Sequence, residues 1–239
     1  MSDAPQPVPP LTPTLTLPRS RGREWEGAVR PEPALNAQGF ADLYPVSRET
    51  LARLEAYADL LTRWSARINL VGRDTLADLW RRHMLDSAQL RPLVPENARS
   101  LIDLGSGAGF PGLVLAILGV PGVELVEADS RKAAFLREAA RIVEAKVAIR
   151  PCRIAAVPPH VVDVVTARAL APLDRLLDLA RPFIGCGTVC LFPKGERAEQ
   201  ELTLARERWT MTVSMHRSIA DPRGVVLRLH QVVREPHEC

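Results

Sequence analysis

A glycine-rich segment that follows a short apolar run constrains this chain more than any other feature. Residues 101–112 read LIDLGSGAGFPG, and Gly107, Gly109 and Gly112 match the spacing G-x-G-x-x-G. A backbone that turns with positive φ, or that approaches a ligand closely, cannot easily carry a Cβ, which explains the glycines. In open α/β sheets, ligands bind at the carboxyl ends of the strands. The segment therefore predicts an α/β fold with a ligand site at this loop.

The chain after residue 99 alternates between apolar runs and helical stretches. Strands and helices joined by short connections predict a mostly parallel sheet covered by helices on both faces. The last two runs are separated only by a short linker with Asp221, Pro222 and Gly224, so we expect them to pair antiparallel. The expected strands are 101–104, 123–128, 146–150, 161–167, 187–192, 211–216 and 225–230, and the expected helices are 113–118, 132–144, 173–180 and 196–208.

Two segments precede this alternating region. Residues 1–46 are rich in proline and lack sustained periodicity, which predicts a disordered or extended tail. From Ser47 onward, apolar residues recur at helical spacing, and a second helical stretch starts at Asp74, which we expect to be its N-cap. Amphipathic helices must bury their apolar faces. We therefore predict a helical extension over 47–98 that packs on a core formed by 99–239.

The composition excludes several classes of protein. A chain of 239 residues can form one domain plus an extension, and no apolar run approaches the ~20 residues of a membrane span. The N-terminus lacks the pattern of a secretory signal, so we expect a cytoplasmic protein, with an organelle transit peptide as the alternative. The four cysteines form no C-x-x-C pair, and we expect buried thiols and no metal site. The net charge of +3 does not by itself indicate a nucleic-acid partner.

Three classes of ligand are compatible with a glycine loop. A Walker-type nucleotide site is excluded because it requires G-K-[S/T], where this chain has Phe-Pro-Gly. A dinucleotide would place its pyrophosphate near Asp103, at a cost of about 1–4 kcal/mol. The positive amino and sulfonium groups of S-adenosylmethionine would instead be attracted, so Asp103 favours this cofactor. Glu127, about 20 residues beyond the loop, can accept hydrogen bonds from the ribose hydroxyls of either cofactor, with Asp129 as the alternative acid.

Several segments in order resemble one known family. The loop and its continuation LVLAI resemble those of the bacterial 16S ribosomal RNA guanine-N7 methyltransferases, also called glucose-inhibited division protein B. The Gly-Phe-Pro-Gly continuation is much more specific than the glycines alone. Further matching segments are INLVGR (68–73), HMLDS (83–87), RKAAFL (131–136), VVDVVTARALAPL (161–173) and FPKG (192–195).

The resemblance implies a seven-stranded, Rossmann-like methyltransferase fold with an N-terminal helical extension. It also implies methylation of N7 of one guanine in small-subunit ribosomal RNA near the decoding centre, with S-adenosylmethionine as cofactor. The partner would be 16S rRNA or the small ribosomal subunit, and we expect a monomer. The family usually has an acidic residue at the position of Ala155, so a side-chain contact there is lost while a backbone contact to the adenine remains. The cofactor contacts implied by the resemblance are Gly105, Phe110, Ile154, Ala155 and Arg168, beside Asp103, Gly107, Gly109 and Glu127.

The implied chemistry needs few side chains. Guanine N7 has a lone pair and no proton to remove, so alignment matters more than a general base. We therefore name no catalytic residue and expect Arg168 to position the cofactor and the target nucleotide. Basic residues at strand ends and first helical turns are expected to bind RNA phosphates. They are Arg131, Lys132, Arg153, Arg168, Lys194 and Arg197.

His83 and Asp86 lie three residues apart on one helix face. We expect a local His–Asp pair that holds the helix, with a contact to the ligand site as the alternative, and Asn69 is equally open. Other functions also remain open: methylation of another RNA, a protein or a small molecule, and RNA binding without catalysis. A dinucleotide oxidoreductase is supported only by the literal glycine match.

Overall fold

The computed structural model describes residues 34–235. Residues 1–33, most of the predicted tail, lie outside this part. For the last residues of the predicted tail, the prediction of a disordered or extended chain is wrong, because Ala37–Leu43 form helix α1. The side chain of Asn36 accepts a hydrogen bond from the Gly39 amide at 2.8 Å, and Phe40 is fully buried. The N-cap and the burial of the Phe40 ring both stabilise this short helix.

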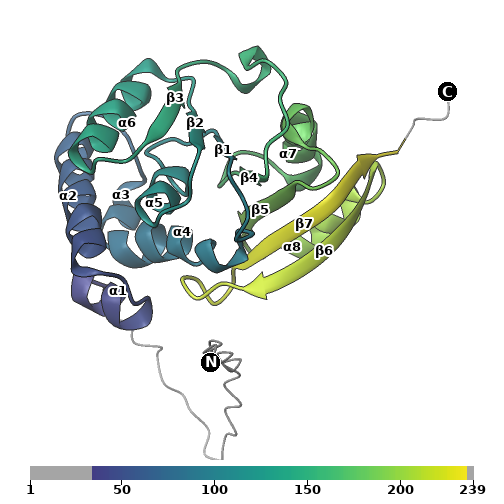
Figure 1. Cartoon of the computed structure of the whole chain (residues 1–239). Helices are drawn as coiled ribbons and strands as arrows, with labels where there is room; N and C mark the ends of the chain where they lie inside the picture. The colour runs from purple at the N-terminus through teal and green to yellow at the C-terminus, as the bar shows by residue number, and fades with distance from the viewer. Residues whose placement is uncertain (1–33, 236–239) are drawn as a thin grey trace, which may run out of the picture. The chain divides into compact units, whose positions relative to one another are not determined.

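A seven-stranded sheet forms the centre of the fold, as predicted (Figure 1). Its strand order is β3-β2-β1-β4-β5-β7-β6. Strands β1 to β5 are parallel, and β7 pairs antiparallel with both β5 and β6, which confirms the expected antiparallel final pair. The strands are β1 Leu101–Leu104, β2 Val123–Val126, β3 Val147–Arg150, β4 Val164–Thr166, β5 Val189–Lys194, β6 Trp209–Arg217 and β7 Val225–Arg234.

Helices cover both faces of the sheet. The helices are α1, α2 Arg48–Ser65, α3 Arg73–Leu76, α4 Asp86–Ala88, α5 Gly112–Ile117, α6 Ser130–Ile142, α7 Leu173–Ala180 and α8 Ala198–Ala205, with a π-helical turn η1 Trp80–Leu85 and 3-10 turns η2 Arg91–Leu93, η3 Ile154–Ala156 and η4 Arg181–Phe183. Successive side chains of a strand point to opposite faces. Leu101 accordingly packs in a cluster with residues of α2, α4, α5 and α6, and Ile102 packs in a second cluster with residues of α7 and α8.

Most predicted element ends differ from the structure by a few residues. The strand predicted over 161–167 spans only Val164–Thr166, and the side chain of Asp163, just before it, accepts hydrogen bonds from the backbone amides of Arg99 and Ser100. The predicted cap at Asp74 is also wrong. The N-cap of helix α3 is Gly72, two residues earlier, and Asp74 lies in the first turn of the helix.

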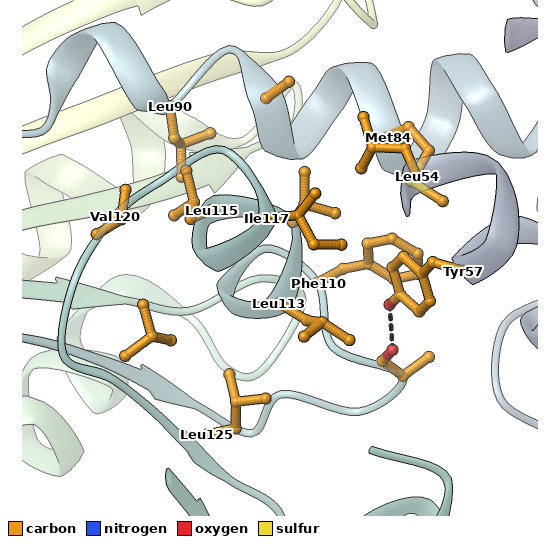
Figure 2. Packing of buried hydrophobic residues seen from close by; sticks show 14 of the residues in the cluster. Leu54, Tyr57, Met84, Leu90, Phe110, Leu113, Leu115, Ile117, Val120 and Leu125 are labelled. Atoms are coloured by element: carbon orange, nitrogen blue, oxygen red, sulfur yellow. Dashed lines mark hydrogen bonds between the residues drawn. The ribbon is translucent and has the colours of Figure 1, made fainter. Parts of the chain in front are cut away.

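The N-terminal helices are anchored directly on the glycine loop. The Tyr57 hydroxyl of α2 donates a hydrogen bond to the carbonyl of Ala108, and its ring centroid lies 5.3 Å from that of Phe110 (Figure 2). Gly109 has φ +101°, and a Cβ there would lie 2.8 Å from the Tyr57 hydroxyl oxygen. The glycine therefore allows α2 to pack close to the loop, and this extension shares one core with the sheet.

Replacement of Gly109 by alanine should show how much this close approach matters. Gly119 also has positive φ, +87°, but a Cβ there would meet nothing within 4 Å, so Gly119→Ala is a matched control for backbone strain alone. We expect Gly119→Ala to lower the free energy of unfolding by about 1 kcal/mol and Gly109→Ala by about 2–4 kcal/mol, since the second also overpacks the core. Urea unfolding measures both values, and equal losses would contradict the proposed packing constraint.

Candidate functional site

A cavity of about 730 Å³ opens where the carboxyl ends of β1, β4 and β5 meet the N-terminal helices. Its walls come from six segments far apart in the sequence and from Glu201. These segments are 70–75, 82–86, 105–110, 168–172, 193–195 and 218–225. The cavity lies at the edge of the sheet where open α/β folds bind ligands.

The glycine loop forms one wall of this cavity through its backbone. Gly105 and Gly107 have φ values of +67° and +59°, which only glycine adopts at little cost. A Cβ on Gly107 would come no closer than 3.9 Å to any other atom, so a side chain there would extend into open space beside the loop. Because Gly107 has no side chain, the backbone of the loop is accessible to a ligand at this position.

Asp103 does not line the cavity. Its side chain is fully buried on β1, where it accepts hydrogen bonds from the Thr166 hydroxyl at 2.9 Å and from the Gly112 amide at 3.2 Å. Burial raises the pKa of this carboxyl to about 6, although these hydrogen bonds and the charge of Arg168 oppose the shift. This burial leaves no exposed surface for the direct cofactor contact predicted for Asp103, and the residue instead ties β1 to β4 and to the start of α5.

Glu127 holds the loop from the neighbouring strand end. Its carboxylate accepts hydrogen bonds from the amide of Gly107 at 2.8 Å and from the amide of Asp129 at 2.7 Å. A carboxylate has about four acceptor positions, so two further donors can still bind. Asp129, the alternative acid, is already engaged: it caps α6 and pairs with Arg131 at 2.9 Å, which holds the pKa of Asp129 well below its usual range.

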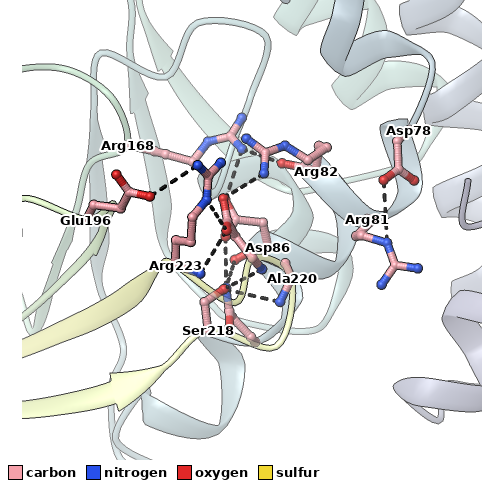
Figure 3. A network of polar contacts seen from close by, with 11 residues as sticks. Asp78, Arg81, Arg82, Asp86, Arg168, Glu196, Ser218, Ala220 and Arg223 are labelled. Atoms are coloured by element: carbon pink, nitrogen blue, oxygen red, sulfur yellow. Dashed lines mark hydrogen bonds and ion pairs between the residues drawn. The ribbon is translucent and has the colours of Figure 1, made fainter. Parts of the chain in front are cut away.

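Arg168, which follows β4, joins the sheet to the N-terminal helices (Figure 3). Its Nη1 donates to the carbonyl of Arg82 at 2.9 Å and to Asp86 Oδ2 at 3.1 Å, and its Nη2 donates to His83 Nδ1 at 2.7 Å. The guanidinium also lies 5.1 Å from the centroid of the Phe110 ring. The predicted local pair between His83 and Asp86 is wrong, because both side chains bind Arg168 and line the cavity.

The titration of His83 and Asp86 is shifted by their burial beside Arg168. Burial, together with the positive charges of Arg168 and Arg82, lowers the pKa of His83 to about 3. Burial raises the pKa of Asp86, and this rise is opposed mainly by Arg168. His83 is consequently a neutral imidazole at physiological pH.

The connection between β6 and β7 closes the cavity from the other side. The Arg82 guanidinium pairs with Asp221 at 2.8 Å, and the Gln89 amide binds Ser218 Oγ at 3.1 Å and the Ile219 amide at 2.9 Å. Figure 3 shows Ser218 and Ala220 of this connection beside Asp86 and Arg82. The sequence prediction missed these contacts, because the partners are about 130 residues apart and carry no local motif.

The predicted basic residues are not gathered in one place. Among them, only Arg168 and Lys194 line the main cavity in the described part of the chain. The Lys194 ammonium donates to the carbonyl of Ala171 at 2.8 Å and to Glu201 Oε2 at 2.7 Å, so its charge is balanced within the protein. Arg197 lines a second cavity of about 350 Å³ that shares Gly195, Glu201 and Asp221 with the first. Arg131, Lys132 and Arg153 line neither cavity.

No helix within residues 34–235 is long and apolar enough to cross a membrane. The same residues contain no group of three or more His, Cys, Asp or Glu side chains arranged to hold a metal ion.

Comparison with known proteins identifies the family. A family model described as GidB, rRNA small subunit methyltransferase G, matches residues 50–225. The chain belongs to this GidB family. A "Ribosomal RNA small subunit methyltransferase G" of Paramagnetospirillum magneticum is 61% identical over 189 residues, covering 79% of this chain and 92% of the relative. One of Rhodospirillum rubrum is 56% identical over 200 residues, covering 84% and 100%.

Solved structures support the methyltransferase fold. An O-methyltransferase from Bacillus cereus, solved in complex with SAH, has a TM-score of 0.54 at 15% identity and covers 81% of this chain and 96% of its own. A ribosomal protein L11 methylase from Lactobacillus delbrueckii has a TM-score of 0.52 at 15% identity, covering 61% and 76%. These similarities concern the fold alone.

The positions implied by the GidB resemblance fall in two groups. Gly105, Phe110 and Arg168 line the main cavity. Ile154 and Ala155 lie on turn η3 after β3, outside the cavity walls but at the same end of the parallel strands. Asn69, left open by the sequence, is exposed and is not among the residues that line the cavity.

The raised pKa of Asp103 gives a testable pH dependence. The folded protein binds a proton at Asp103 up to about pH 6, whereas the unfolded chain releases it near pH 4. Between these values the stability contributed by Asp103 falls as pH rises, by about 1.4 kcal/mol per pH unit. The difference in unfolding free energy between wild type and Asp103→Asn should therefore decrease from pH 4 to pH 6 and then level off.

Asp163→Asn provides a control of opposite sign. Hydrogen bonds from the backbone amides of Arg99 and Ser100 lower the pKa of Asp163, so its contribution to stability is lost as pH falls below about 4. Urea unfolding from pH 3 to pH 8 measures both differences, and other titrating groups cancel in each. A difference for Asp103→Asn that grows between pH 4 and pH 6 would show that the carboxyl is stabilised as an anion.

Proposed function

We propose that this chain transfers a methyl group from S-adenosylmethionine to N7 of a specific guanine in 16S ribosomal RNA, near the decoding centre. The observation that carries this proposal is that the family match over residues 50–225 includes every residue that lines the cavity beside the glycine loop. The relatives that cover most of the chain are named ribosomal RNA small subunit methyltransferase G.

The residues around the loop fit S-adenosylmethionine, which when bound supplies a methyl group on a positively charged sulfur. The open space above Gly107 leaves room for a ligand against the backbone. The remaining acceptor positions of Glu127 suit the two hydroxyls of a ribose. For Gly109 and Asp103, both buried behind this surface, we propose that they hold the loop in place. Ile154 and Ala155 are proposed to contact the adenine, Ala155 through its backbone.

The chemistry of the cavity suits a nucleophile that carries no proton. Both ring nitrogens of His83 are engaged, by Arg168 at 2.7 Å and by Thr75 at 3.0 Å, so this neutral ring is not placed to remove a proton. The Cys190 thiol is fully buried, with its pKa raised to about 12, and no cysteine is among the cavity residues of the described chain. A lone pair such as that of guanine N7 needs alignment alone, which can contribute several kcal/mol.

The RNA would meet the enzyme along the ends of the parallel strands. We propose that Arg131, Lys132, Arg153 and Arg197 contact phosphates, which position RNA without reading its sequence. For Lys194 we propose a different role, because its ammonium already holds the segment 168–172 through Ala171. We further propose a monomer that acts in the cytoplasm.

The decisive experiment uses labelled S-adenosylmethionine and small ribosomal subunits from cells that lack this gene. We expect about one label per subunit, recovered as 7-methylguanosine from 16S rRNA after digestion. Label in another nucleoside, or transfer only to another RNA, a protein or a small molecule, would refute the assigned substrate. Bound cofactor without any transfer would favour a binding role.

Arg168→Ala should lower kcat/KM for rRNA by about 100-fold, because the guanidinium is expected to orient the reacting groups. Arg175→Ala is the matched control, since Arg175 is exposed on α7 and does not line the cavity. Equilibrium binding of S-adenosylhomocysteine to both variants separates a loss of cofactor affinity from a loss of RNA alignment. Full activity and unchanged cofactor affinity in Arg168→Ala would show that Arg168 positions neither ligand.

A further inference from the structure

Three side chains on the cavity wall form a hydrogen-bonded chain that begins at Arg168. The Arg168 Nη2 lies 2.7 Å from His83 Nδ1, and His83 Nε2 lies 3.0 Å from Thr75 Oγ1. The Thr75 hydroxyl is in turn 2.8 Å from the carbonyl oxygen of Gly72. All four residues line the main cavity.

The chemistry of the groups gives this chain one direction. A guanidinium only donates, so His83 Nδ1 must accept and carries no proton. The neutral ring then has its proton on Nε2 and donates it to Thr75 Oγ1. Because the backbone carbonyl of Gly72 only accepts, the Thr75 hydroxyl donates to it. The histidine is therefore held in one tautomer, with its acceptor nitrogen facing Arg168.

We propose that His83 is a positioning residue, whose Nδ1 acceptor fixes the guanidinium of Arg168 in the orientation that binds the ligand. The side chain of His83 is nearly completely buried, and its ring stacks on Phe110 with a centroid separation of 4.8 Å and an interplanar angle of 25°. The ring is thereby fixed by stacking on one face and by hydrogen bonds at both nitrogens. Such a support keeps a binding group in place without contacting the ligand.

Arg168 retains donors for a ligand after these contacts. Three of its five N–H groups are used by Arg82, Asp86 and His83. The remaining two, the Nε–H and one N–H on Nη2, have no acceptor within residues 34–235. They suit an oxygen acceptor in the cavity, either the carboxylate of the cofactor or a carbonyl oxygen of the target base. The inference rests on the proposed function only for its activity readout.

Two substitutions of His83 separate positioning from packing. His83→Asn keeps an acceptor oxygen near the position of Nδ1 but removes the stacked ring. His83→Phe keeps the ring but replaces the acceptor by C–H, and a contact of 2.7 Å is too short for carbon, so the guanidinium must move. If His83 positions Arg168, His83→Phe should lower kcat/KM about 100-fold and His83→Asn about 10-fold or less. If His83 only packs, the order is reversed.

His160→Phe is the matched control. His160 also packs against an aromatic ring, Phe183, at 5.4 Å, but it is not among the residues that line the cavity. This variant should retain wild-type activity. Circular dichroism and urea unfolding of all three variants show whether any loss of activity reflects a loss of folded protein.

Separate binding measurements identify which oxygen Arg168 holds. A weaker Kd for S-adenosylhomocysteine in His83→Phe, with unchanged KM for rRNA, points to the cofactor carboxylate, and the reverse points to the base. If the Kd for S-adenosylhomocysteine, the KM for rRNA and kcat are all unchanged in His83→Phe, the proposal is overturned. A wild-type protein that transfers no methyl group to rRNA would refute the proposed function but not the inference, which NMR of the His83 ring nitrogens tests independently. A proton on Nδ1 would then overturn it.

Discussion

Two buried carboxylates hold the glycine loop in the shape on which the site depends. Asp103 on β1 accepts a hydrogen bond from the Gly112 amide, and Glu127, which follows the neighbouring strand β2, accepts one from the Gly107 amide. A loop of glycines would otherwise lose much conformational entropy on folding and would not hold one shape. The hydrogen bonds to these two carboxyl groups compensate for part of that entropy, although burial of the Asp103 charge is itself costly and raises the pKa of this carboxyl to about 6. The cavity wall is therefore held by side-chain hydrogen bonds as well as by backbone geometry.

The N-terminal helices complete this site rather than merely covering the sheet. Tyr57 binds the loop at Ala108, and His83 and Asp86 hold the guanidinium that follows β4. These contacts cross from one helix layer to the carboxyl ends of the strands. The same helical segment also carries Arg82, which fastens the connection between β6 and β7 through Asp221. A change in the packing of the extension would consequently alter three walls of the cavity: the glycine loop, the segment after β4 and the connection between β6 and β7.

The features that could be predicted from the sequence are those that depend on neighbours along the chain. The strand and helix periods, the glycine loop and the acid at Glu127 all follow from local pattern. The buried position of Asp103 could not be predicted, because it depends on Thr166 lying directly opposite on β4. The local pair favoured for His83 and Asp86 was wrong for a similar reason, whereas the alternative of a contact at the ligand site agrees with their place on the cavity wall. A pair at spacing i, i+3 indicates a local contact, yet both His83 and Asp86 form hydrogen bonds with Arg168, which is more than 80 residues away in the sequence.

The pKa values of two groups at the site are shifted in opposite directions: that of His83 is lowered and that of Asp103 is raised. His83 stays neutral mainly because it is buried, and also because a positive ring would lie beside Arg168, so it can serve as an acceptor at any pH above about 3. Asp103 becomes an anion only above about pH 6, after overcoming the cost of its burial. Near neutral pH the wall thus combines a neutral acceptor that holds Arg168 with a buried anion behind the loop. Under the proposed function, that anion would attract the positively charged groups of S-adenosylmethionine through the loop without a direct contact, because charges interact more strongly where the dielectric constant is low.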